Sequence, residues 1–337
     1  MDYKNKSVLI TGGTGSLGVA LTKYFLNNHP EISRLIVYSR DEQKQFLMSD
    51  QFPYSTYPQM RYFIGDIRDK SRLQRALNDV DYVIHAAAMK HVHIAEYNPD
   101  ECVKTNIGGA QNLIEACLSP ESNVSHVVAL STDKACAPIN LYGATKLTSD
   151  KMFVSANNFS GKKNIKFSVV RYGNVFGSNG SVVPFFLKKK SSGVLPITNE
   201  NMTRFNISLQ DGVKMVLHAL ENAWGGELFV PKIPSYNILD MANAICSSSV
   251  KKVIGTRPGE KIHEEMITSS DSYNTFDIGE FYVILPTNPN WSLENYISEF
   301  NARKVKEGFS YNSGSNNEWE TIKTLKTYIN KYIEKQI

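Results

Sequence analysis

The sequence predicts an α/β protein with a Rossmann-like, doubly wound parallel sheet and a smaller C-terminal substrate-binding cap. Three observations lead to this prediction. Over the first half of the chain, short apolar runs alternate with helical periods, a pattern typical of a parallel sheet covered by helices on both faces. A glycine-rich loop separates the first apolar run from the first helical period. After about residue 175 the alternation weakens and turns multiply.

Each expected element rests on a local pattern. Strands are expected at the apolar runs 7–10, 35–38, 61–64, 82–84, 126–130 and 167–170. Helices are expected at the periodic stretches 19–26, 71–77, 98–117, 142–157 and 238–246, and from about residue 318. The helix near residue 98 has a start signal, because Asn98 could cap it, Pro99 takes the first position and Glu101 follows three residues after the cap.

The length of 337 residues suggests about two domains. We expect residues 1–175 to form the Rossmann domain, whose core continues into later segments. Residues 176–337 should supply mainly the cap and a C-terminal helix.

Composition and charge exclude several classes of protein. The excess of 37 Lys and Arg over 33 Asp and Glu is only +4, far from the basic footprint of a nucleic-acid binder. Apolar runs of about five residues fall short of the roughly 20 that cross a membrane, and no signal-peptide pattern is present. The four cysteines form no C-x-x-C pair. We therefore expect a cytoplasmic homo-oligomer that binds no nucleic acid, membrane or metal.

The loop after the first strand has the spacing of a dinucleotide-binding turn. Gly12, Gly15 and Gly18 recur every third residue, which allows a tight turn, close approach of a pyrophosphate, and packing of helix on strand. The N–H groups of the following helix would then face the phosphates. The expected contacts come from Gly12, Thr14, Gly15, Ser16, Leu17 and Gly18.

The end of the second strand indicates which dinucleotide binds. An NAD-selective protein places Asp or Glu there for the ribose 2′-hydroxyl. This chain has Ser39 and Arg40, and Asp41 only after them. Because a guanidinium suits a 2′-phosphate, we favour NADP, although Asp41 leaves NAD as an alternative.

Residues after the next two strands complete the expected cofactor site. Asp66, followed by Ile67, is placed either to touch adenine or to cap a helix. The small Ala87 would let the cofactor pass close to the backbone, and Lys90 follows on the same loop.

Tyr142 and Lys146 form the expected chemical centre. Their i, i+4 spacing places them on one helix face, and no other tyrosine of this chain has a lysine four residues on. A neighbouring ammonium lowers the pKa of a phenol, which would make Tyr142 a usable acid or base. The alternative is a surface pair on an amphipathic helix.

Thr132, Asp133 and Lys134 follow the strand before this helix. The carboxyl ends of parallel strands form the edge at which open α/β sheets bind ligands. Lys134 could act as a base if it is held partly neutral, and Asp133 as an acid if it is partly desolvated. A solvated loop is the alternative.

Weaker signals come from later residues. Asn174 follows the next strand and could hold a substrate amide or phosphate, while Arg204, Arg257 and Glu260 could bind a diphosphate and a ribose. A surface role is equally open for each. His91 and His93 lack a carboxylate or cysteine at ligand spacing, so we expect a loop or substrate-side role rather than a metal site.

Together these motifs resemble the extended short-chain dehydrogenases/reductases that act on nucleotide sugars. The similarity is closest to inverting UDP-N-acetylglucosamine 4,6-dehydratases. It rests on residues 86–91, 131–135, 142–146, 171–175 and 203–205, and it covers nearly the whole chain.

The resemblance implies a lyase with tightly bound NADP. Tyr142, supported by Lys146 and Thr132, would take the proton of the sugar's 4-hydroxyl as the C4 hydride leaves. Lys134 would then remove the C5 proton, and Asp133 would protonate the departing 6-hydroxyl. UDP-N-acetylglucosamine would contact Lys90, Asn174, Arg204, Arg257 and Glu260. The product would be UDP-2-acetamido-2,6-dideoxy-β-L-arabino-hex-4-ulose, the first intermediate of pseudaminic acid synthesis.

Two other functions remain open. A nucleotide-sugar 4-epimerase would need Tyr142 and Lys146 but no acid–base pair at residues 133 and 134. A catalytically silent NADP-sensing protein would usually lack the tyrosine or the lysine, and this chain keeps both.

Overall fold

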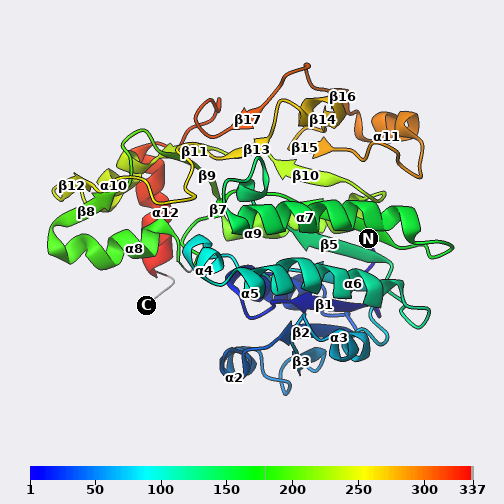
Figure 1. Ribbon diagram of the computed structural model, residues 1–337. Coiled ribbons are helices and arrows are strands. Elements are labelled where there is room, and N and C mark those ends of the chain that lie inside the picture. The colour runs from blue at the N-terminus through cyan, green and yellow to red at the C-terminus, as the bar shows by residue number, and fades with distance from the viewer. Residues whose placement is uncertain (179, 335–337) are drawn as a thin grey trace.

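The computed structural model describes residues 1–178 and 180–334. A ten-stranded sheet forms its centre, in the order β16-β14-β15-β10-β6-β5-β4-β1-β2-β3 (Figure 1). Its strands are β1 (Ser7–Thr11), β2 (Arg34–Ser39), β3 (Met60–Ile64), β4 (Tyr82–His85), β5 (His126–Leu130), β6 (Lys166–Val170), β10 (Leu228–Pro231), β14 (Thr275–Asp277), β15 (Phe281–Ile284) and β16 (Arg303–Lys304).

Seven neighbouring strands, β3 to β10 in spatial order, pair in parallel, while β15, β14 and β16 continue the sheet antiparallel. The expected doubly wound parallel sheet is therefore confirmed. Helices α1 (Ser16–Asn28), α2 (Glu42–Gln51) and α9 (Leu209–Asn222) bury apolar side chains against one face. Helices α3 (Lys70–Ala76), α6 (Gly109–Leu118) and α7 (Leu141–Ala156) cover the other.

The expected helix at 98–117 is interrupted. It consists of α5 (Pro99–Val103), a π-helical turn (Lys104–Gly108) and α6, and it follows the short α4 (Val92–Tyr97). A helix begins at Pro99, as the start signal predicts, and Asn98 takes the cap position. The Asn98 side chain makes no cap hydrogen bond, and its amide instead donates to the carbonyl of Ile94 (3.0 Å). Glu101 pairs with Arg68 instead of closing a capping box.

Most of the remaining helices and strands gather to the left of the large sheet in Figure 1. A third apolar core joins α8 (Val182–Lys189), α10 (Ile238–Ile245) and α12 (Ile322–Glu334). Three small sheets accompany them, built from β7 (Asn174–Val175), β9 (Thr203–Ile207) and β11 (Ser235–Asn237), from β8 (Val194–Ile197) and β12 (Val250–Val253), and from β13 (Glu265–Ile267) and β17 (Tyr311–Asn312). Helix α11 (Leu293–Phe300) packs near β14 and β15 at the far sheet edge.

The later half therefore contributes both to the small sheets and, through β10 and β14–β16, to the large one. The domain division at residue 175 stays a prediction. Among the described residues, none of the helices combines the length and the apolar character needed to cross a membrane.

Candidate active site

The glycine loop between β1 and α1 is shaped for close approach of a ligand. Gly12 has φ +63°, and a Cβ there would lie 2.8 Å from the backbone nitrogen of Ala87. A Cβ at Gly18 would lie 2.4 Å from the carbonyl oxygen of Gly13, so only glycine lets α1 begin here. Among the described residues, no side chain caps the start of α1. The loop thus fits a pyrophosphate, whose oxygens would accept hydrogen bonds from the backbone N–H groups at the start of α1.

The neighbouring strand end is held by a buried hydrogen-bond network. The hydroxyl of Thr11 accepts from the Ala87 N–H (3.2 Å) and contacts Nδ1 of His85 (2.8 Å). Burial lowers the pKa of His85 to about 3, so its ring is neutral, and it shares one hydrogen bond with the Thr11 hydroxyl. This network fixes Ala87 against Gly12, where the cofactor was expected to pass.

At the end of β2, Arg40 and Asp41 make different contacts. Asp41 caps α2 by accepting from the Lys44 N–H (3.0 Å). Arg40 is mostly exposed and lies 3.7 Å from Asp66 Oδ2. The hydroxyls of Thr14 and Ser39 hydrogen-bond at 2.9 Å and join the glycine loop to this strand end. Asp41 is therefore engaged in capping α2, whereas the Arg40 side chain is mostly exposed at the end of β2.

Asp66 is not a helix cap. The cap of α3 is Asp69, whereas Asp66 pairs with Arg68 at 2.7 Å. Ile67 is buried against Gly109 of α6, so only its backbone could reach a cofactor. Lys90 lies exposed on the loop after β4.

Tyr142 and Lys146 lie in the first turns of α7, which Asn140 caps by accepting from the Gly143 N–H (2.7 Å). Both side chains are buried, so they are not a surface pair. Burial raises the pKa of Tyr142 to about 12, and the largest opposing charge is Lys134 rather than Lys146. The expectation of a lowered phenol pKa is therefore wrong for this protein without its ligands. Burial also lowers the pKa of Lys146.

Thr132 lies between Tyr142 and the acid–base pair. It acts to lower the pKa of the Tyr142 phenol, and its hydroxyl donates to Asp133 Oδ1 (2.9 Å). Lys134 Nζ lies 3.1 Å from the same oxygen. Asp133 is fully buried, and burial raises the pKa of its carboxyl despite the opposing charge of Lys134. Asp133 thus meets the condition set for an acid.

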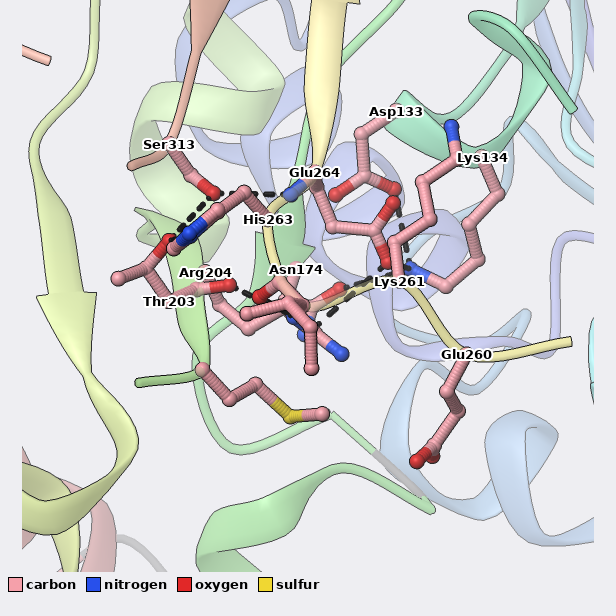
Figure 2. A network of polar contacts seen from close by, with 12 residues as sticks. Asp133, Lys134, Asn174, Thr203, Arg204, Glu260, Lys261, His263, Glu264 and Ser313 are labelled. Atoms are coloured by element: carbon pink, nitrogen blue, oxygen red, sulfur yellow. Dashed lines mark hydrogen bonds and ion pairs between the residues drawn. The ribbon is translucent and has the colours of Figure 1, made fainter. Parts of the chain in front are cut away.

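Lys134 is not held neutral, contrary to the condition set for a base. Burial lowers the pKa of its amine, but the carboxylates of Asp133 and Glu264 outweigh burial and raise it overall. Glu264 Oε1 lies 3.1 Å from Lys134 Nζ (Figure 2). Sequence analysis missed Glu264, although adjacent carboxylates after Arg257–Glu260 were a possible signal.

Two expected substrate residues reach this cluster. Asn174 Oδ1 accepts from Lys134 Nζ at 3.4 Å. Arg204 is buried, donates to the carbonyls of Thr203 and Ile262, and lies 3.8 Å from Glu264 Oε1. Its guanidinium is therefore engaged with these protein groups, and a contact with the substrate stays a prediction.

Arg257 and Glu260 lie apart from the cluster on the loop before β13. They pair with each other at 3.6 Å, and Figure 2 shows Glu260 pointing away from Lys134. The loop is anchored to the active-site helix because the Asn140 amide donates to the Gly259 carbonyl (2.8 Å). His91 and His93 contact each other through their rings. Within residues 1–178 and 180–334, no group of three His, Cys, Asp or Glu side chains could hold a metal.

Fold and site together define a short-chain dehydrogenase/reductase of the extended type. A glycine loop follows the first strand of the sheet, and a buried Tyr-x-x-x-Lys pair follows the fifth strand. Residues 8–286 match the family described as polysaccharide biosynthesis protein, and the chain belongs to this family.

Named relatives and a solved structure show which proteins this chain is similar to. A Campylobacter jejuni protein named UDP-N-acetylglucosamine 4,6-dehydratase (inverting) is 56% identical over 335 residues, covering 97% of this chain and 98% of its own. The X-ray structure of Pen from Bacillus thuringiensis is 34% identical, with a TM-score of 0.87 and 99% coverage of both chains. A Rickettsia bellii protein named UDP-glucose 4-epimerase is 38% identical over 304 residues, 88% of each chain. The resemblance to inverting 4,6-dehydratases is thus confirmed.

Proposed function

We propose that this enzyme is an inverting UDP-N-acetylglucosamine 4,6-dehydratase, a hydro-lyase. The observation that carries the proposal is the grouping of Thr132, Asp133 and Lys134 beside Tyr142: the Thr132 hydroxyl and Lys134 Nζ both donate to Asp133 Oδ1, and Thr132 and Lys134 both act on the Tyr142 phenol. It places an oxidation residue and an elimination pair beside each other, as removal of water from a hexose requires. The 56% identity to a protein of that name supports it.

Oxidation at C4 is assigned to α7. Tyr142 takes the proton of the 4-hydroxyl, and the Lys146 ammonium stabilises the phenolate that begins the step. A nicotinamide cofactor bound at the glycine loop would supply the hydride acceptor for C4 and the hydride donor for C6. The resulting 4-ketone acidifies the C5–H bond and prepares elimination.

Elimination is assigned to the Asp133–Lys134 pair. Transfer of one proton from Lys134 Nζ to Asp133 across 3.1 Å creates a neutral amine and a neutral carboxylic acid together. Lys134 then removes the C5 proton as the C5–C6 double bond forms, and Asp133 protonates the departing 6-hydroxyl to give water. These transfers restore the ion pair. After hydride reaches C6, C5 is protonated from the opposite face, which inverts it.

The cofactor is proposed to be NADP rather than NAD. The support is local: Arg40 is mostly exposed at the end of β2, where it lies 3.7 Å from Asp66 Oδ2, while Asp41 is engaged in capping α2. The pyrophosphate would lie at Gly12–Gly18, and the adenine side near Asp66. Lys90, Asn174, Arg204, Arg257 and Glu260 remain proposed substrate contacts. The homo-oligomer, the cytoplasmic location and the pseudaminic acid pathway also stay predictions.

Mass spectrometry after incubation with UDP-N-acetylglucosamine tests the function. We expect a product that has lost one water. A product of unchanged mass that separates from the substrate would mean a 4-epimerase, the name of the Rickettsia bellii relative. An unaltered substrate would favour an NADP-sensing protein. Asp133→Asn is the informative companion, since it should abolish water loss and an epimerase would not need its carboxyl.

A further inference from the structure

Glu264 joins the elimination pair from a distant part of the chain. Its side chain is 2% exposed, and Oε1 lies 3.1 Å from Lys134 Nζ and 3.8 Å from Arg204 Nε. Oε2 is buried and accepts no hydrogen bond within the described residues. The backbone on either side is fixed, because the Glu264 N–H donates to the Ser313 hydroxyl (2.9 Å) and its carbonyl accepts from the Ser313 N–H (2.8 Å).

This backbone anchor is itself part of a network. The Ser313 hydroxyl contacts that of Thr203 (2.8 Å), which also contacts His263 Nδ1 (2.8 Å) (Figure 2). Thr203 precedes Arg204 on β9, so the same network positions the partner cation. Glu264 is therefore held in place by its main chain and is not a mobile surface carboxylate.

The charges around Glu264 balance. Asp133 and Glu264 supply two carboxylates, and Lys134 and Arg204 supply two cations. The other titratable groups that act on this cluster are Lys261 before β13, Tyr236 of β11 and Tyr142 of α7. Burial disfavours the carboxylate of Glu264, but Lys134 and Arg204 outweigh burial and lower its pKa. Glu264 is thus a fixed negative charge during turnover.

We propose that Glu264 is a positioning residue for elimination: its carboxylate holds Lys134 Nζ beside Asp133 and keeps one proton on that pair. The inference rests on the proposed function. Lys134 has a flexible four-carbon stem, and the contacts with Glu264 and Asn174 fix where its nitrogen lies. The buried negative charge opposes loss of the shared proton to bulk water.

The consequence is a specific pH signature. The reactive form of the pair carries one proton, so activity falls when the pair gains a second proton or loses the last one. Glu264 raises the pKa of both Lys134 and Asp133. Removing the charge of Glu264 must therefore shift both the acid and the alkaline limb of the pH–activity profile toward lower pH.

The experiment compares wild type with Glu264→Gln across pH, measuring kcat and KM for UDP-N-acetylglucosamine. We expect both limbs of kcat to move down by about one pH unit or more. At the optimum, kcat should fall about ten- to hundredfold because Lys134 is less well placed, while KM changes little. In a single turnover, oxidation should proceed and elimination should lag, so reduced nicotinamide should accumulate.

Two further variants keep the test decisive. Glu264→Asp retracts the charge by one methylene and should shift the limbs less, in the same direction, even if Glu264→Gln does not fold. Glu265→Gln is the matched control, because Glu265 lies next in sequence beside Lys261 and Asp271, and its limbs should not move.

The inference would be overturned if the pH profiles of the Glu264 variants were unshifted, or if Glu265→Gln shifted equally. The proposed function would still stand in that case, provided that the wild type removes water. A wild type that removes no water would overturn both.

Discussion

Lys134 Nζ lies 3.1 Å from Asp133 Oδ1, in a pair whose carboxylate is fully buried. The distance is short enough for direct proton exchange between adjacent residues. Because one transfer makes both a base and an acid, the pair does not need a lysine that is neutral at rest. This resolves the conflict between the raised pKa of Lys134 and its assigned task.

Replacement of Lys134 by methionine should block elimination while leaving oxidation possible. Methionine keeps much of the apolar stem but cannot take the C5 proton. We expect a 4-keto hexose and reduced nicotinamide to accumulate, seen by mass spectrometry and absorbance. Removing one partner of a buried ion pair costs about 3–5 kcal/mol, so the melting temperature should also fall. Formation of the 6-deoxy product at near wild-type rate would show that another group is the base.

Tyr142→Phe should stop the reaction one step earlier. Without the phenol no group takes the 4-hydroxyl proton, so no reduced-nicotinamide absorbance should appear on addition of substrate. Tyr172, which is partly buried and interacts with Tyr142, offers a matched control: Tyr172→Phe should retain the absorbance change. If Tyr142→Phe still reduces the cofactor, the assignment of α7 to oxidation is incorrect.

Arg40→Ala should weaken discrimination between NADP and NAD. A charge-assisted hydrogen bond contributes about 1.5–3 kcal/mol, which corresponds to roughly tenfold or greater preference. Titration of wild type and variant with both cofactors measures this ratio, and Lys44→Ala on the adjacent helix is the control for general charge. Equal affinities in the wild type would contradict NADP selectivity.

His85 should make the protein less stable in acid. Burial lowers its pKa from 6.5 to about 3, so the folded state binds fewer protons than the unfolded state between these values. Its stabilising contribution is complete above pH 6.5 and is lost as pH falls toward 3. In His85→Gln the slope of unfolding free energy against pH should decrease by up to about 1.4 kcal/mol per unit.

Reaction in D₂O should place deuterium at C5 with the L-arabino configuration at early times. The base removes the C5 proton from one face, and inversion requires its return to the other, where solvent must supply it. NMR of the first product formed distinguishes the two faces. A persistent D-xylo product would assign retention while leaving the fold and the site residues unchanged.

Local patterns were sufficient for the parts of this protein that are contiguous in sequence. The glycine loop, the buried strands and the Tyr142–Lys146 spacing depend on neighbouring residues, because backbone sterics and helical periodicity act over a few positions. The adjacency of Asp133 and Lys134 at a strand end was visible for the same reason. Asn98 marks the limit: the helix begins at Pro99 as predicted, but the Asn98 side chain makes no cap hydrogen bond and its amide donates to Ile94 of the preceding helix.

Only the tertiary structure decided the charge state of the site. The pKa values of Tyr142 and Lys134 follow from burial and from carboxylates brought together in space, and Glu264 reaches Lys134 from β13 far along the chain. Likewise, β10 and β14–β16 join the sheet through long-range pairing. Desolvation and Coulomb interactions depend on distance in the folded protein, and the order of residues along the chain does not contain those distances.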